Sequence, residues 1–207
     1  MLQRLFAELL CIQPESPVFE GFSGRYPAFP SRTLVDIRHD AGINSLRALV
    51  LADTHLRGDL SKLPGDVWDH VEDADVVLHA GDVVTGDLLD ALRARRPVHA
   101  VLGNNDAALV GALPDRLELE LAGVRIAMLH DTGARTGRER RLHRWFPDAR
   151  LVVFGHSHEP VDCEGVDGQR LFNPGSAVQR RRQPRRTVGR LELADGHIVG
   201  HQIVPVT

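Results

Sequence analysis

The sequence predicts an α/β (α+β) protein in which two mixed β-sheets pack face to face with helices on the outside. In the first half of the chain, short apolar runs alternate with segments of helical pattern, which is typical of βαβ units and a parallel sheet. In the second half, apolar and polar residues alternate around glycine turns, which is typical of antiparallel hairpins. With 207 residues, the chain is long enough for one domain with a substantial core.

The first 45 residues differ from the rest of the chain. Leucine and phenylalanine side chains between residues 2 and 10 lie on one face of a short amphipathic helix, and frequent prolines and glycines follow. We interpret residues 1–45 as an N-terminal extension that is partly disordered or docked as an arm, and residues 46–207 as the folded domain. Termini are usually poorly ordered unless they are tied down, which favours the disordered extension.

Regular patterns begin at Leu46 and first predict strands joined by helices. The strands are continuous apolar runs over residues 48–52, 76–80 and 98–102, as expected when both faces of a sheet are buried. The helices between them cover residues 67–74 and 87–95. Functional loops of parallel sheets gather at the carboxyl ends of the strands, so polar residues directly after these runs should lie close together.

Later elements are mainly hairpins. In chain order we predict a hairpin over residues 117–129 that turns at Gly123, a basic helix over residues 138–146, a buried strand over residues 151–154, and hairpins over residues 161–172 and 190–204. Each of the last two hairpins contains an Asp-Gly pair, which favours a tight turn.

Five short motifs follow predicted strands and carry side chains that can bind metal ions. They are Asp53-Thr54-His55, Gly81-Asp82, Gly103-Asn104-Asn105-Asp106, His130-Asp131 and Gly155-His156-Ser157-His158. Together they supply seven candidate ligands: Asp53, His55, Asp82, Asn104, His130, His156 and His158. Seven oxygen and imidazole donors are too many for one tetrahedral zinc ion and suit two ions that share a bridging ligand.

The spacing and chemistry of these residues indicate how they would act. Asp53 and His55 are two residues apart, so an extended segment would project both side chains to the same side. Asp82 is the natural bridge because its two oxygens can each serve one ion. Nitrogen and oxygen ligands without thiolate favour Mn²⁺, Fe or Zn²⁺ over Cu(I) and Ca²⁺. A single Asp after a strand is usually structural, so the prediction depends on the five motifs together.

In this order, the motifs resemble those of the calcineurin-like metallophosphoesterases: D-x-H, GD, GN-x-[DE], a His and GH-x-H, over residues 47–204. Asn173-Pro174-Gly175-Ser176 is similar to the NPGS motif of the small bacterial and archaeal phosphodiesterase branch, whose fold also resembles a retromer subunit. The resemblance implies a four-layer αββα sandwich and a metallophosphoesterase domain over residues 46–207. It also implies a hydrolase acting on phosphoric ester bonds, a phosphodiesterase first, with a phosphomonoesterase or nuclease as alternatives.

The resemblance also implies a role for each candidate ligand. The first ion would be held by Asp53, His55 and His158, the second by Asn104, His130 and His156, and Asp82 would bridge them. A hydroxide between the two ions would be the nucleophile. Mn²⁺ is the expected metal, with Fe, Zn²⁺ or Ni²⁺ as alternatives.

One position departs from the family pattern. Many members have a histidine directly after the motif asparagine, and it is thought to contact the phosphate or protonate the leaving group; this chain has Asn105. Asparagine can donate a hydrogen bond to a phosphoryl oxygen but cannot transfer a proton at neutral pH. We therefore expect a preference for acidic leaving groups, as in aryl phosphodiesters. Asp106 is expected to orient Asn104 or Asn105. The catalytic candidates are Asn105, Asp106 and His130.

Net charge and charge distribution limit the classes of binding partner that we expect. The net charge of −3 disfavours a globally basic nucleic-acid binder. The run Arg180-Arg181-Arg182-Gln183-Pro184-Arg185-Arg186 is either a solvated loop or a lip that gathers phosphate. The expected partner is a small phosphoester substrate, and nucleic acid and a homo-oligomer stay open. A non-catalytic protein-interaction module on the same fold is the alternative from another functional class.

Compositional features also predict the location. Two cysteines form no disulfide framework and fit a reducing setting. No run approaches the ~20 apolar residues of a membrane span, and the N-terminus lacks the pattern of a secretory signal. We expect a cytoplasmic protein without a membrane partner.

Overall fold

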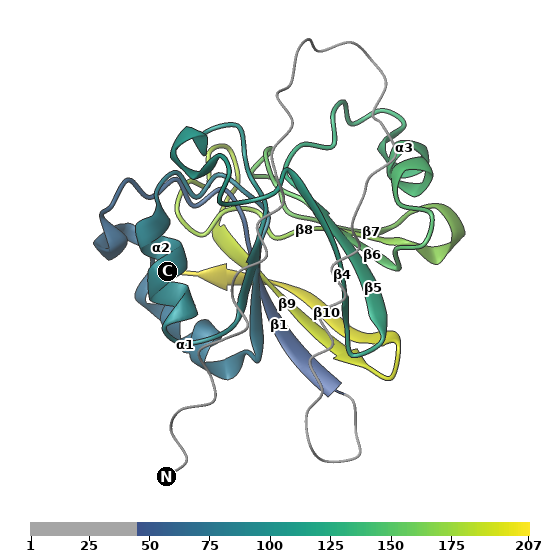
Figure 1. Cartoon of the computed structure of the whole chain (residues 1–207), viewed down its shortest axis with the longest axis horizontal. Coiled ribbons are helices and arrows are strands. Elements are labelled where there is room, and N and C mark those ends of the chain that lie inside the picture. Colours follow the sequence, from purple (N-terminus) through teal and green to yellow (C-terminus); the bar gives the residue numbers. More distant parts are fainter. Residues whose placement is uncertain (1–44) are drawn as a thin grey trace. The chain divides into compact units, whose positions relative to one another are not determined.

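The computed structural model describes residues 45–207 (Figure 1). The predicted N-terminal extension therefore lies outside the described residues, except for Ser45, which begins the first strand. None of the helices in the described range is long and apolar enough to cross a membrane.

The first sheet has the strand order β10-β9-β1-β2-β3. Strands β1 (Ser45–Leu51), β2 (Val76–His79) and β3 (Val98–Ala100) are parallel neighbours. Helices α1 (Gly65–Asp73) and α2 (Gly86–Arg93) connect them in sequence, which confirms the predicted βαβ units. The hairpin β9 (Arg186–Ala194) and β10 (His197–Val206) adds antiparallel to β1 and is longer than predicted.

The second sheet has the order β4-β5-β6-β8-β7. Its predicted hairpins are both confirmed: β4 (Arg116–Leu121) with β5 (Val124–Leu129), and β7 (Val161–Glu164) with β8 (Arg170–Asn173). Strand β6 (Leu151–Val153) is parallel to both β5 and β8, so the sheet is mixed. Helix α3 (Arg138–Trp145) lies between β5 and β6 in the chain, at its predicted place.

Short 3₁₀ turns complete the connections. They are η1 (Leu60–Lys62), η2 (Ala107–Leu109) and η3 (Val166–Gly168). The last of these forms the turn of the β7–β8 hairpin at the predicted Asp-Gly pair.

Alternation along the strands distributes side chains between separate cores. On β1, Val50 packs between the two sheets with Ile126 and Met128, whereas its neighbour Leu49 packs on the opposite face against α1 and α2. Residues Val67 and Val71 are four apart on α1 and bury the same helical face.

A third core places α3 on the outer face of the second sheet. Leu142 on α3 and Phe146 just after it pack against Val152 of β6. Helices therefore cover the outer faces of both sheets (Figure 1), as in the predicted four-layer αββα sandwich.

Strand β3 differs from its prediction. It has three residues, and Val98 and His99 are partly exposed, because β3 is the edge strand of its sheet. The expectation of burial on both faces is therefore wrong for this strand. The chain leaves the sheet after Ala100 and turns toward the loops that carry the sequence motifs.

Candidate metal centre

The loops that carry the five motifs meet at one end of the two sheets. Backbone hydrogen bonds tie the loop after β1 to the loop after β2: Asp53 N–H donates to the carbonyl of Gly81 (3.0 Å), and His55 N–H to that of Asp82 (2.9 Å). The loop after β6 joins them from the second sheet, since His156 N–H donates to Asp53 Oδ1 (3.1 Å). Both sheets therefore contribute to one site.

A first group of side chains consists of Asp53, His55 and His158. The two histidine Nε2 atoms lie 3.1 Å apart, and Asp53 Oδ1 lies 3.4 Å from His158 Nε2 and 4.0 Å from His55 Nε2. One ligand atom from each residue lies within 4.8 Å of the others, so the three can meet one ion.

A second group converges on Asn104. Its Oδ1 lies 3.2 Å from His130 Nε2 and 2.9 Å from His156 Nδ1. His130 also forms a compact set of possible ligands with Asp53 and Asp82. Asp53 Oδ1 lies 3.9 Å from His130 Nε2, so this carboxylate is close to both groups.

Asp82 lies between the two groups. Its Oδ2 is 3.4 Å from His55 Nε2 and 3.3 Å from His130 Nε2. The structure thus brings all seven predicted ligand residues together, with this carboxylate at the position expected of a bridge.

Hydrogen bonds outside the centre orient two of the imidazoles. Nδ1–H of His158 donates to the carbonyl of Gln179 (2.6 Å), and Nδ1–H of His130 donates to that of Ala80 (2.7 Å). Because a carbonyl can only accept, Nδ1 carries the proton in both rings. The Nε2 lone pair of His158 therefore faces the centre, and Nε2 of His130 faces the Asp82 carboxylate.

Burial controls the charge of the first group. It raises the pKa of Asp53 to about 7, and Oδ2 of this fully buried carboxylate has no hydrogen-bond partner among residues 45–207. Burial also lowers the pKa of His158 to about 4 and lowers the pKa of His55, which keeps both rings neutral. A buried carboxylate with an unpartnered oxygen beside two neutral imidazoles fits a divalent cation.

At Asp82 and His130, hydrogen bonds outweigh burial in setting the direction of the pKa shifts. Burial alone would raise the pKa of Asp82, but hydrogen bonds from His130 and Asn105 lower it overall, so this carboxylate stays ionised. Burial likewise opposes protonation of His130, yet its hydrogen bonds to Asp82 and Ala80 raise its pKa. The donor set and its charge therefore suit divalent metal ions.

The backbone at the candidate ligands is strained. Five of the seven have a left-handed φ: Asp53 (53°), His55 (49°), Asp82 (58°), His156 (71°) and His158 (56°). The prediction of an extended Asp53-Thr54-His55 segment is therefore wrong, because the loop bends at both ends of the motif. Each such residue costs on the order of 1 kcal/mol, and strain of this kind is concentrated at functional sites.

Glycine is required where the loops approach most closely. A Cβ on Gly103 would lie 2.2 Å from both the backbone nitrogen and Oδ1 of Asp82. The absence of a side chain at this glycine allows the loop after β3 to enclose Asp82.

The structure corrects the role expected of Asp106. Instead of orienting Asn104 or Asn105, its buried carboxylate accepts three backbone N–H groups. Oδ2 accepts from Asp82 (2.9 Å) and Gly103 (2.7 Å), and Oδ1 accepts from Val84 (2.6 Å). Asp106 thus fixes the loops after β2 and β3 relative to each other.

Asn105 contacts the central carboxylate. Its backbone N–H donates to Asp82 Oδ1 and its Nδ2 to Asp82 Oδ2, each at 2.8 Å. The amide expected to face a phosphoryl oxygen is therefore also a positioning group for Asp82.

Sequence reasoning did not predict the residues that support the centre from behind. Ser176 Oγ donates to the carbonyl of Asp53 (2.7 Å), and Asn173 Nδ2 donates to the carbonyl of Gly155 (2.9 Å). Both belong to the NPGS motif, which was the available signal. His79 is fully buried, lies 3.1 Å from Thr54 Oγ1 through its Nε2, and has a pKa lowered to about 3 by burial. It ends β2 and contacts Thr54, the residue between the candidate ligands Asp53 and His55, so it supports the centre rather than binding in it.

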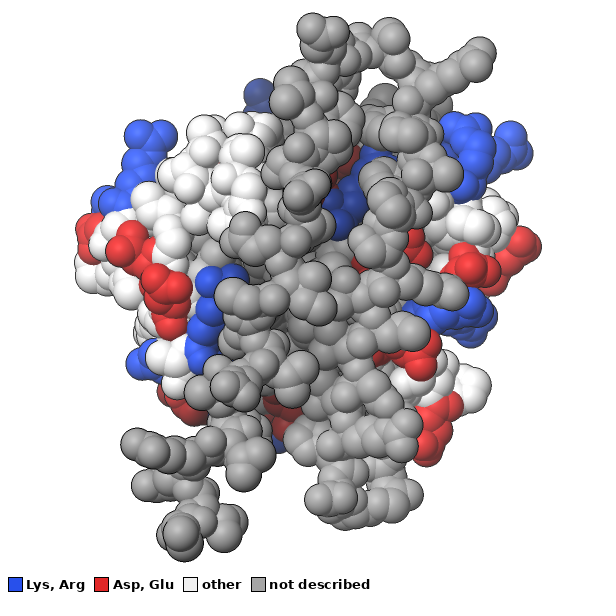
Figure 2. Space-filling model, in the orientation of Figure 1, with Lys and Arg blue, Asp and Glu red and all other residues white. Residues whose placement is uncertain are grey.

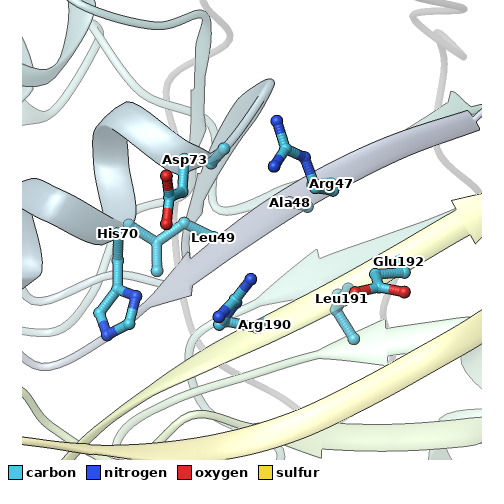
Figure 3. A pocket seen from close by; sticks show the side chains of 9 residues that line it. Arg47, Ala48, Leu49, His70, Asp73, Arg190, Leu191 and Glu192 are labelled. Carbon is cyan, nitrogen blue, oxygen red and sulfur yellow. The ribbon is translucent and has the colours of Figure 1, made fainter.

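A hollow elsewhere on the first sheet is separate from this centre. Figure 3 shows it between β1, β9 and α1, with Arg47, Arg190, Asp73 and Glu192 among the side chains that line it. None of the seven candidate ligands lines it. Its two arginines and two carboxylates balance in charge, so it offers no selective site for an anion.

Residues 46–196 match the calcineurin-like phosphoesterase superfamily domain. The chain belongs to this superfamily. It is 31% identical over 155 residues to a "Probable metallophosphoesterase" of Methanothermobacter thermautotrophicus, with 72% of this chain and 90% of that protein covered. A second "Probable metallophosphoesterase", from Methanocaldococcus jannaschii, is 31% identical over 151 residues, with 70% and 75% covered.

Solved structures show the same fold. Vacuolar Protein Sorting 29 of Cryptosporidium parvum has a TM-score of 0.64 at 18% identity, covering 77% of this chain and 96% of that chain. Vps29 of Entamoeba histolytica, complexed with Zn²⁺, has a TM-score of 0.61 at 22% identity, covering 77% and 99%. Calcineurin-like phosphoesterases use divalent metals, and the described residues include groups that can hold them. The curated relatives support a phosphoesterase hydrolase.

Proposed function

We propose that this calcineurin-like protein is a metal-dependent phosphodiesterase with a dinuclear centre. The first ion is held by Asp53, His55 and His158, the second by Asn104, His130 and His156, and Asp82 bridges them. The observation that carries the proposal is the position of Asp82 Oδ2, 3.4 Å from His55 Nε2 and 3.3 Å from His130 Nε2. One ionised carboxylate oxygen between two imidazoles of different groups is the arrangement that a shared ligand needs.

When bound, two divalent cations supply an activated water nucleophile and neutralise charge that builds up on the phosphoryl oxygens. The residues of the chain orient and desolvate the site. Ser176 and Asp106 hold the loops in place, and burial keeps His55 and His158 neutral and able to bind cations. Mn²⁺ is the expected metal.

Asn105 determines the expected leaving group. Its amide lies beside Asp82, where it can donate a hydrogen bond to a phosphoryl oxygen, but it has no proton to transfer. His130 uses its Nδ1–H toward the carbonyl of Ala80 and its Nε2 toward the centre. Asn105 therefore offers no general acid, and Nε2 of His130 would be occupied by the second ion, which favours esters whose leaving groups are stable as anions.

The net charge of −3 favours a small phosphoester over a long polyanion as the substrate. Figure 2 shows basic and acidic side chains interspersed on the described part of the one face that it draws. A mixed face of this kind provides little of the counterion-release energy that drives nucleic-acid binding.

The proposal is tested by titrating metal-free protein with Mn²⁺ in a calorimeter and by assaying bis(p-nitrophenyl) phosphate beside p-nitrophenyl phosphate. We expect two Mn²⁺ per chain, metal-dependent turnover and faster hydrolysis of the diester. Asp82→Asn should lower kcat/KM by about 100-fold or more and reduce the stoichiometry. The matched control is Asp69→Asn, an exposed carboxylate on α1, which should behave as wild type.

Metal-independent turnover, or an Asp82→Asn variant that retains full activity, would refute the dinuclear mechanism. Faster hydrolysis of the monoester would reassign the substrate class. Tight metal binding without hydrolysis of either ester would favour a non-catalytic interaction module on this fold.

A further inference from the structure

The loop after the NPGS motif is attached to the candidate metal centre at two points. Ser176 Oγ donates to the carbonyl of Asp53 (2.7 Å) and also accepts the N–H of Gln179 (2.9 Å). The carbonyl of Gln179 in turn accepts Nδ1–H of His158 (2.6 Å). The residues directly after Gln179 therefore begin beside the first group of candidate ligands.

Those residues form a turn with an unfavourable backbone. The N–H of Gln183 donates to the carbonyl of Arg180 (2.8 Å), which closes a four-residue turn. Arg181 occupies its second position with φ 49°. Glycine is favoured at a turn position with positive φ, because other residues are strained there. A strained arginine at the edge of a candidate active site points to a role for its side chain.

Arg181 lies beside the first group of candidate ligands along the chain. It follows two residues after Gln179, whose carbonyl accepts Nδ1–H of His158 (2.6 Å). The side chain of Arg181 is exposed, and no carboxylate between residues 45 and 207 forms an ion pair with it. The turn thus places Arg181 close to the first group, and no residue in the described part of the chain uses the hydrogen-bonding capacity of its guanidinium.

The neighbouring arginines are arranged differently. Arg180 donates through Nη1 to the carbonyl of Gln183 within the turn (2.8 Å). Arg182 is exposed and does not have the positive φ of Arg181. Arg181 therefore differs from Arg180 and Arg182 in its position within the turn.

A guanidinium beside two bound divalent cations would need an anionic ligand to offset the repulsion between the positive charges. Divalent ions in the two groups would repel the guanidinium, and a bound phosphoryl group would attract both. The planar fork of arginine matches two phosphate oxygens, and such charged hydrogen bonds are about twice as strong as neutral ones.

We propose that Arg181 is a substrate-binding residue whose guanidinium binds the non-bridging oxygens of a phosphoryl group held at the candidate metal centre. The proposal rests on the proposed phosphoesterase function and adds a residue that the seven candidate ligands do not include. Arg181 acts when anion and metal are both present, and it selects for substrates with unesterified phosphoryl oxygens on the side of the first group.

The test compares Arg181→Gln with Arg182→Gln, which makes the same change of charge one residue away. We expect Arg181→Gln to raise both KM for bis(p-nitrophenyl) phosphate and the inhibition constant of inorganic phosphate about tenfold or more. For Arg182→Gln both constants should change less than about twofold, the small effect expected of an exposed charge. Calorimetry without phosphate supplies a separate readout: Arg181→Gln should bind Mn²⁺ as tightly as wild type or more tightly, because a repelling charge is gone.

A third variant separates binding from structure. Arg181→Gly removes the guanidinium and also relieves the positive φ, so its thermal midpoint should equal or exceed that of wild type while KM rises as in Arg181→Gln. A lowered midpoint together with weakened Mn²⁺ binding would show that Arg181 only supports the loop and would overturn the proposal.

The outcomes distinguish the two proposals. If wild type hydrolyses the diester and the Arg181→Gln and Arg182→Gln variants have the same KM and inhibition constant, the role of Arg181 is wrong and the phosphoesterase function stands. If wild type neither binds Mn²⁺ nor hydrolyses either ester, the function itself is wrong and the role of Arg181 falls with it.

Discussion

Gly103→Ala should disrupt the candidate metal centre although it replaces none of the candidate ligands. A Cβ at this position would lie 2.2 Å from the nitrogen and Oδ1 of Asp82 and 2.8 Å from its Cγ. Real contacts of this kind are rarely closer than 3.0–3.4 Å, so the two loops must separate by about 1 Å. Asp82 cannot move away from the added methyl group, because hydrogen bonds from its backbone to Asp106 and from Asn105 to its carboxylate hold it in place.

The size of the effect follows from that displacement. Overpacking of this kind costs about 1–3 kcal/mol of unfolding free energy, and a shift of about 1 Å at a catalytic group can reduce the rate about 100-fold. We expect both losses in Gly103→Ala. Differential scanning fluorimetry measures the stability, calorimetry measures the Mn²⁺ affinity, and the diester assay measures the rate.

Gly65→Ala is the matched control. Gly65 begins α1 and a Cβ there would meet nothing within 4 Å, so alanine should be neutral or stabilising. If Gly103→Ala kept the Mn²⁺ affinity and rate of wild type within threefold, the close packing of the loop against Asp82 would not position the carboxylate, and the reasoning would be refuted.

Three further predictions concern protonation and the core. The Mn²⁺ affinity should rise about tenfold per pH unit up to about pH 7 and then level off, because the cation must displace a proton from Asp53, whose pKa is raised to about 7; an affinity that is constant from pH 5.5 to 7 would contradict this. The pKa of His79 is lowered from 6.5 to about 3, so the unfolded chain binds more protons between these values and stability is lost as the pH falls from 6.5 toward 3. Chemical denaturation should show a shallower loss in His79→Gln than in wild type, whereas the exposed control His197→Gln should keep the wild-type slope. Gln169→Ala should lower the unfolding free energy by about 2 kcal/mol or more, since its buried Nε2 donates to two backbone carbonyls at 2.8 and 3.0 Å; an equal loss in the exposed Gln202→Ala would contradict this explanation.

The strands and helices could be predicted because their signals are local. The alternation that sends Leu49 to one core and Val50 to another is visible in a few consecutive residues. The length and burial of strand β3 were overestimated, because its position at the sheet edge depends on which strands pair. No short segment of the sequence contains that information.

The candidate ligands were predictable from motif order, but their supports were not. Asp106 was expected to orient an asparagine, and it binds three backbone amides instead, two of them in the loop after β2. The backbone bends at Asp53 and His55 could not be predicted either. Local preference disfavours a positive φ at both residues, and hydrogen bonds to distant loops stabilise it.

The amino-acid sequence by itself determined the layers of the fold, the order of the motifs and the types of donor atoms, because periodicity and side-chain chemistry are properties of short segments. Tertiary structure decided how the donors converge. The contact between His156 and Asp53 joins residues 103 positions apart, and the φ of Arg181 depends on a turn anchored to His158. Such contacts join residues that are far apart in the chain, so the geometry and charge of the centre belong to the folded chain.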